Sequence, residues 1–133
     1  MDYFARDELA AVTRLYDVAP PGSGLFALVG NLPWKFQNYT SYRYARVTPE
    51  LDWGRIDKDP QRSVRSLAAL MTSNRRPAYL ILTRSQSAAA ELADGVSPRT
   101  IVRFERAIAN SPRFREIYRN PNARIFMLRR SSA

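Results

Sequence analysis

The sequence AYLILTRSQ at residues 78–86 decides the fold prediction for this chain. Its first five residues follow a proline and are all compatible with a buried strand, whereas the last four are polar and start a new element. A second apolar run, LFALV at residues 25–29, is preceded and followed by glycine and fits another buried strand. Two such strands separated by helical sequence predict an α/β fold with parallel neighbours.

The polar tip Thr83–Gln86 follows the first of these strands. Ligands in open α/β sheets bind beyond the carboxyl ends of parallel strands, so a ligand site is one interpretation of the tip. The other is that Ser85 caps the next helix, with Arg84 in solvent. In both cases we expect Gln86 to be at least partly exposed.

Helical periodicity and capping signals place four helices around these strands. We expect them at residues 5–17, from the Asp59-Pro60 pair to about 72, at 86–94 before Gly95, and from the Ser97-Pro98 pair to about 110. The side chains expected to face inward are Leu9, Val12, Leu15, Tyr16, Val64, Leu67, Leu70, Met71, Ile101, Phe104 and Ile108.

Two alternating runs near the end of the chain, 114–119 and 123–128, flank the turn sequence Asn120-Pro121-Asn122. They predict a β-hairpin whose turn residues accept unusual dihedral angles. The prediction for the whole chain is an α/β fold, a three-layer sandwich with a small mixed sheet and a C-terminal β-hairpin. A length of 133 residues fits a single domain, residues 1–133.

Composition restricts the chemistry. The chain contains no cysteine and no histidine, which excludes disulfides, thiolate nucleophiles and histidine acid–base catalysis, and we expect no metal and no cofactor. The net charge of +9 favours anionic partners such as lipid headgroups, phosphorylated substrates or nucleic acid. No stretch approaches the roughly 20 apolar residues of a membrane-spanning helix.

Residues 30–59 show no regular periodicity. We expect a functional site in this segment before any other, because long irregular connections in compact domains are often functional. Within this segment, Tyr42 and Tyr44 fit one face of a short strand, with Arg43 opposite. Stacking rings beside cations suit saccharides or single-stranded nucleic acid, although the rings also suit a satellite core at the sheet edge. The aromatic set is Trp34, Phe36, Tyr39, Tyr42, Tyr44 and Trp53.

Four carboxylates, Glu50, Asp52, Asp57 and Asp59, lie in the same region. A pair of acids flanking a glycosidic bond would suit glycoside hydrolysis. The alternative is a set of solvated ion pairs, with Asp59 already used as a helix cap.

Several stretches together resemble a known family. The sequences YLILTRSQ (79–86), ELADGVSP (91–98) and SPRFREIYRNPNARIFML (111–128) are similar to the soluble C-terminal region of actinobacterial multi-pass membrane proteins of the glycosyltransferase type, which use polyprenyl-phosphate sugars. PPGSGLFALVGNLPW (20–34) and YTSYRY (39–44) extend the resemblance over nearly the whole chain. The most distinctive spacing is F-x-x-x-Y-x-N-x-x-A-x-I-F-x-L.

The resemblance implies an extracytoplasmic domain excised from a larger membrane protein and packed on its transmembrane portion. In such transferases the catalytic acid lies in an early loop of the membrane portion, so no catalytic residue is carried over to this chain. The implied role is non-catalytic support or handling of a saccharide or polyprenyl-phosphate sugar, next to an anionic membrane surface. Residue type then suggests Asn31, Trp34, Tyr39, Tyr42, Tyr44, Arg84 and Gln86 as substrate-binding candidates.

Two other classes of function remain open. One is a free-standing cytoplasmic binding protein for an anionic ligand or nucleic acid, although the chain has no RNA-binding aromatic signature and we do not expect nucleic acid as its partner. The other is a small enzyme that depends on Asp52 or Asp57.

Overall fold

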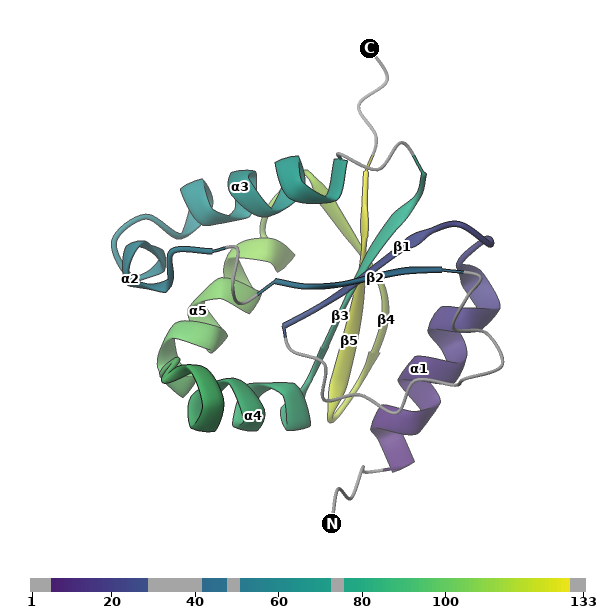
Figure 1. The fold of residues 1–133 in the computed structure, drawn as a ribbon, viewed down its shortest axis with the longest axis horizontal. Helices are drawn as coiled ribbons and strands as arrows, with labels where there is room; N and C mark the ends of the chain where they lie inside the picture. The colour runs from purple at the N-terminus through teal and green to yellow at the C-terminus, as the bar shows by residue number, and fades with distance from the viewer. Residues whose placement is uncertain (1–5, 29–41, 48–50, 73–75, 130–133) are drawn as a thin grey trace.

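The computed structural model describes residues 6–28, 42–47, 51–72 and 76–129, without the side chains of 92–94. The described helices and strands follow the order expected for an α/β domain (Figure 1). They are α1 (Arg6–Val18), β1 (Gly24–Ala27), β2 (Arg43–Arg46), α2 (Trp53–Ile56), α3 (Pro60–Thr72), β3 (Ala78–Thr83), α4 (Arg84–Asp94), α5 (Pro98–Ala109), β4 (Phe114–Asn120) and β5 (Ala123–Leu128).

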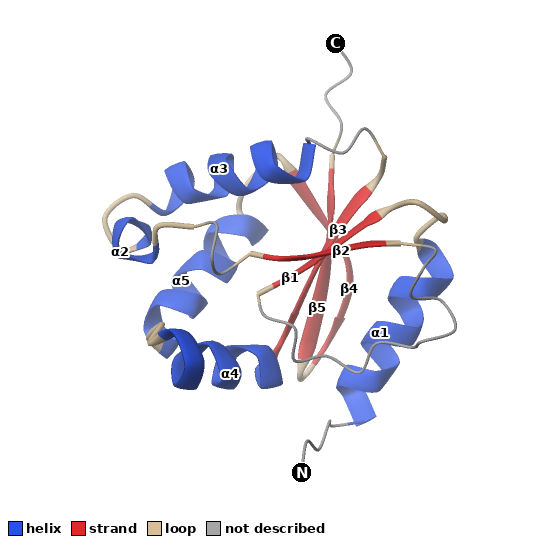
Figure 2. Ribbon diagram, in the orientation of Figure 1, coloured by secondary structure: helices blue, strands red, loops and turns tan. Residues whose placement is uncertain are grey.

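The strands form one mixed sheet in the order β2-β1-β3-β5-β4 (Figure 2). β1 pairs in parallel with β2 and with β3, whereas β5 runs antiparallel to both β3 and β4. The predicted mixed sheet, the parallel neighbours and the C-terminal hairpin are therefore confirmed. Because β1 and β3 are parallel, their carboxyl ends lie at the same edge of the sheet. This is the edge where the ligand-site interpretation of residues 83–86 places a ligand.

Helices cover both faces of the sheet. Figure 1 shows α1 on one side and α2 to α5 on the other, which gives three layers. Two cores result: a larger one between the sheet and α3, α4 and α5, and a smaller one under α1. Because β3 is central and covered on both faces, all six of its residues are buried.

Most of the predicted helix boundaries are confirmed. Asp59 Oδ1 accepts a hydrogen bond from Arg62 N at the start of α3, and the Ser97 side chain accepts one from Thr100 N at the start of α5. Gly95 ends α4 in the left-handed conformation, at φ 66°. That conformation is easily reached by glycine, which explains why the helix stops there.

Three local predictions are wrong. Leu9 is exposed, because the buried face of α1 is centred on Glu8, Ala11, Val12 and Leu15, and Leu9 falls at its border. The hairpin turn needs no unusual dihedral angles, since no described residue other than glycine has a positive φ. The short helix α2 lies in the segment predicted to be irregular, and its buried Ile56 anchors it to the larger core.

Candidate functional site

The tip of β3 is organised by Gln86, which is fully buried, so the prediction that it is partly exposed is wrong. Its Oε1 accepts a hydrogen bond from Leu28 N at 2.6 Å, and its Nε2 donates to Ile81 O at 2.9 Å. The side chain thereby joins the chain at the end of β1 to the end of β3. A buried backbone amide needs such a partner, and that requirement keeps the glutamine inside.

The helix cap at this tip is Thr83, so the prediction that Ser85 caps the helix is wrong. Thr83 Oγ1 accepts a hydrogen bond from Gln86 N at 3.2 Å. Threonine at the cap and glutamine three residues later match the capping-box pattern, which the sequence contained and our prediction overlooked. Here, however, the glutamine side chain bonds to β1 and β3 as well as to the cap hydroxyl.

Ser85 instead connects α4 to α1. Its hydroxyl donates a hydrogen bond to Glu8 Oε2 at 2.8 Å. Glu8 is buried, and its other carboxylate oxygen has no partner among the described residues. Glu8 lies in the first turn of α1, where a carboxylate also suits the helix dipole.

The turn of the hairpin meets the same tip. Asn120 Nδ2 donates to the backbone oxygen of Asp7 at 2.7 Å, and Asn122 Nδ2 donates to Asp7 Oδ2 at 2.9 Å. The backbone of Arg84 donates to Asn122 O at 3.1 Å. α1, α4 and the β4–β5 turn are therefore fixed to one another at the carboxyl end of β3.

A cleft of about 540 Å³ opens beside this tip, between α4, α5 and the hairpin. Arg84 and Ser87 line it from α4, and Glu105 lines it from α5. Its apolar wall includes Leu82, Ile101 and Val102, of which Val102 is 50% exposed. The hairpin contributes four polar side chains, Arg119, Asn120, Asn122 and Arg124.

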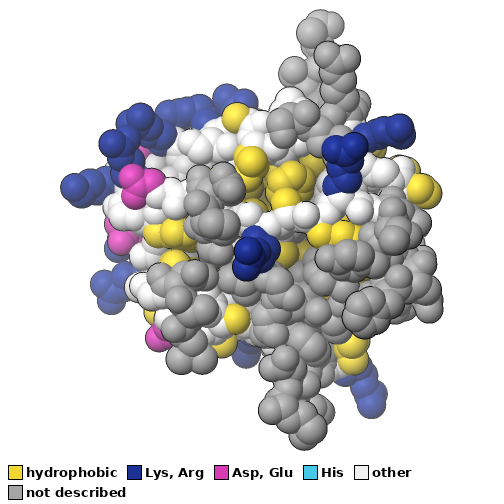
Figure 3. All heavy atoms as spheres, viewed as in Figure 1, with side chains coloured by type: hydrophobic (Ala, Val, Ile, Leu, Met, Phe, Trp, Pro, Cys, Tyr) yellow, Lys and Arg dark blue, Asp and Glu magenta, His cyan; other side chains and the backbone are white. Residues whose placement is uncertain are grey.

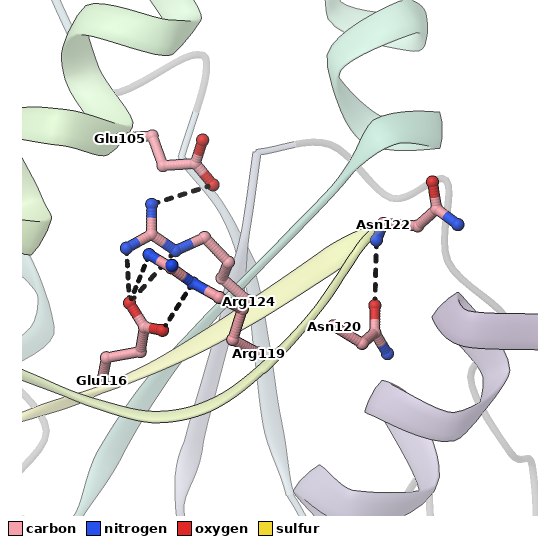
Figure 4. A network of polar contacts seen from close by, with 6 residues as sticks. All are labelled: Glu105, Glu116, Arg119, Asn120, Asn122 and Arg124. Atoms are coloured by element: carbon pink, nitrogen blue, oxygen red, sulfur yellow. Dashed lines mark hydrogen bonds and ion pairs between the residues drawn. The ribbon is translucent and has the colours of Figure 1, made fainter.

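Arg124 is the most engaged cation of the cleft (Figure 4). Its guanidinium forms a short ion pair with Glu116, to which its Nε also donates at 3.1 Å. The same group lies 4.9 Å from the centre of the Phe126 ring, a distance that suits a cation–π contact. With its side chain only 17% exposed, Arg124 holds the hairpin together and has little capacity left for a ligand.

Arg119 shares the carboxylate of Glu116, with 2.9 Å between its Nε and Glu116 Oε1. Its side chain is exposed, so this ion pair contributes little to stability. Figure 4 shows both arginines pointing toward Glu116 from the two strands of the hairpin.

Glu105 and Arg84 are the two ionisable side chains of the cleft that are least engaged. Glu105 Oε1 lies 3.8 Å from Arg124 Nη1, too far for a hydrogen bond, and no described residue donates a hydrogen bond to its carboxyl group. Burial raises the pKa of Glu105, an effect that Arg124 and Arg119 partly offset. Arg84 is exposed, and its guanidinium has no ion pair or hydrogen bond with any described residue.

The two described tyrosines among the candidates lie away from the cleft. Tyr42 precedes β2 at the opposite edge of the parallel strands, where its hydroxyl donates to Ala19 O at 2.9 Å. The hydroxyl groups of Tyr44 and Tyr16 lie 2.7 Å apart, and all three rings pack on the smaller core. Burial raises the pKa of Tyr42, and the neighbouring Tyr16 raises it further by a smaller amount.

Of the predicted binding residues that the structure describes, it brings only Arg84 and Gln86 to the tip of β3, and Gln86 uses its side chain to join the strands. Tyr42 and Tyr44 line the sheet edge next to α1. Asn31, Trp34 and Tyr39 lie outside the described residues.

The predicted carboxylate cluster is divided among separate contacts. Asp57 accepts hydrogen bonds from Thr100 Oγ1 and from Arg103 Nη1, and so joins the segment after α2 to α5. Asp52 forms an exposed ion pair with Arg55 at 3.3 Å, and Asp59 caps α3. Glu50 lies outside the described residues.

The fold and the cleft define a three-layer α/β domain with a polar cleft at the carboxyl end of its central strand. Comparisons of this chain with protein-family models, with curated proteins and with solved structures found no match. In the described part of the chain, no helix has the length and apolar character needed to cross a membrane. Nor do three or more acidic side chains come together there in a group that could hold a metal ion.

Proposed function

We propose that this domain is a non-catalytic binding module that holds the anionic group of its ligand in the cleft at the end of β3. The ligand classes that follow from the resemblance are a saccharide and a lipid phosphate, handled on the extracytoplasmic side for a glycosyltransferase-like membrane protein. A native reading frame with apolar spans upstream of these residues would support that setting.

The observation that carries the proposal is the unengaged guanidinium of Arg84 at the rim of a cleft of about 540 Å³. The cleft lies where α/β sheets commonly bind ligands, beyond the carboxyl end of a parallel strand. Arg119 adds a second exposed guanidinium on the facing hairpin. Guanidinium groups bind phosphate and carboxylate through paired N–H donors, and the cleft therefore suits an anion.

A binding role also accounts for the acidic residues better than a catalytic one. Asp57 and Asp59 are used to fix helices, and Asp52 is paired on the surface. Such contacts are ordinary for structural carboxylates. We therefore assign no catalytic step to them.

The test is a two-dimensional NMR titration of the isotope-labelled domain with a polyprenyl-phosphate analogue in detergent, a panel of oligosaccharides and an oligonucleotide. We expect the phosphate-bearing lipid to shift resonances of residues that line the cleft, chiefly in α4, α5 and the β4–β5 turn. Shifts confined to other surfaces, or a response to the oligonucleotide alone, would contradict the proposal.

A further inference from the structure

The two ionisable side chains of the cleft that form no hydrogen bond with a described residue have opposite charge and come from different helices. Arg84 is the first residue of α4, and Glu105 belongs to α5. Both line the same cleft, and the hairpin's Arg124, which lies 3.8 Å from Glu105, is held chiefly by Glu116. A purely anion-binding cleft would have no use for a carboxyl group whose one ion pair, with Arg124, is long and leaves it without a hydrogen-bond donor among the described residues.

Glu105 carries a carboxyl group that can accept a hydrogen bond from a ligand. Its side chain is 29% exposed, and no hydrogen bond from a described residue reaches it. A half-buried carboxyl group has lost much of its hydration, and leaving it without donors costs free energy. A donor group on a bound ligand would remove that cost. The raised pKa of Glu105 has the same origin in burial.

We propose that the cleft recognises a bifunctional ligand, in which an anionic group binds Arg84 and a hydrogen-bond donor, ammonium or hydroxyl, binds Glu105. This inference rests on the proposed function and adds a second subsite to it. It narrows the ligand class to phosphate-bearing amines or alcohols and leaves simple anions as weak ligands.

The experiment uses three small phosphates that differ only in the group beside the anion: ethyl phosphate, 2-hydroxyethyl phosphate and 2-aminoethyl phosphate. NMR titration of the domain at pH 7 gives a Kd for each. We expect 2-aminoethyl phosphate to bind about tenfold more tightly than ethyl phosphate, the gain typical of a charge-assisted hydrogen bond. We expect the Kd of 2-hydroxyethyl phosphate to lie between the other two values if a neutral donor is sufficient.

The variant E105Q removes the charge but keeps a similar shape, and it should abolish the preference for the ammonium compound. The matched control is E91Q, since Glu91 is an exposed glutamate on α4 that does not line the cleft. Loss of the preference in E105Q but not in E91Q supports the inference.

Two other outcomes overturn it in distinguishable ways. If all three phosphates bind equally well and E105Q changes nothing, the donor subsite is wrong and the anion site stands. If none of them shifts the residues of the cleft, then the proposed function and this inference both fail.

Discussion

At the scale of single residues, Gln86 shows how one polar side chain can determine the end of a sheet. It occupies the place where a ligand would contact the strand ends, and its amide satisfies backbone groups of two strands. The adjacent Arg84 and Ser85 point to different neighbours, with Arg84 lining the cleft and Ser85 bonded to Glu8. Only Arg84 among these three is available to a ligand in the cleft.

Replacement of Gln86 by leucine should destabilise the fold. The substitution keeps a similar volume but leaves Leu28 N and Ile81 O without their side-chain partner, which costs about 2–4 kcal/mol in the free energy of unfolding. Urea denaturation of the purified domain measures the change. The control is Q61L: Gln61 is exposed on α3 and makes one long hydrogen bond to Ala107 O, so it should cost less than about 1 kcal/mol. Equal losses in the two variants would contradict the role given to Gln86.

The residue scale is also where prediction from the sequence failed most clearly. The pattern Thr83-x-x-Gln86 contains the information for the helix cap, but the contact from Gln86 to Leu28 joins residues 58 positions apart. Local sequence propensity cannot predict such a contact, because it depends only on residues close together in the chain. The same holds for Glu8 and Ser85, which are brought together only when α1 and α4 are placed on opposite faces of the sheet at the end of β3 (Figure 1).

At the scale of elements, local signals were sufficient for most of the fold. Apolar runs predicted β1 and β3, and cap-and-proline pairs predicted the starts of α3 and α5, because capping and burial act within a few residues. α2 escaped prediction because a single helical turn has too few residues to show periodicity. Its stability comes from tertiary contacts, including the packing of Trp53 edge-on against Phe104 at 5.3 Å.

The cap of α5 gives a prediction at this scale. The Ser97 side chain accepts a hydrogen bond from Thr100 N, and S97A should therefore lower the free energy of unfolding by about 1 kcal/mol. A thermal or urea denaturation curve measures it. S66A is the matched control, because Ser66 is an exposed serine inside α3 and should change stability by no more than about 0.5 kcal/mol. A neutral S97A would show that tertiary packing alone fixes this helix.

At the scale of the whole molecule, the charge balance is strongly basic. On the face shown in Figure 3, lysine and arginine side chains project around the part of the molecule that carries α2 and α3, with few acidic side chains among them. Together with a net charge of +9, this distribution favours the approach of anionic ligands, and their association should weaken as salt is added.

Stability should depend on pH through Glu105. Burial raises the pKa of this carboxyl group in the folded chain above its ordinary value of 4.5, so the folded state binds the proton more tightly than the unfolded state. The free energy of unfolding contributed by this group therefore falls as pH rises from the ordinary value through the raised one.

The variant E105Q lacks this titration, and its stability relative to the wild type should rise with pH over that window. Urea midpoints between about pH 4 and pH 8 measure the difference. The control E91Q changes an exposed glutamate and should stay parallel to the wild type. Parallel curves for E105Q as well would mean that Glu105 is not perturbed by burial.

The cleft itself could not be predicted from the sequence. The tip of β3 was predicted at the correct edge of the sheet, and Arg84 was among the binding candidates. The other walls come from α5 and the hairpin, and their proximity depends on the antiparallel pairing of β5 with β3. Glu105 was not singled out, because one glutamate on an amphipathic helix shows no local sign of its burial.

The central claim is that Arg84 holds an anion in this cleft, and the most direct measurement is the Kd of 2-aminoethyl phosphate for three proteins: the wild type, R84A and R14A. Arg14 is an exposed arginine on α1, across the sheet from the cleft, and controls for the loss of one positive charge. The account predicts about tenfold weaker binding for R84A and an unchanged Kd for R14A, as expected when one direct guanidinium contact is lost. Equal Kd values for R84A and R14A would contradict it.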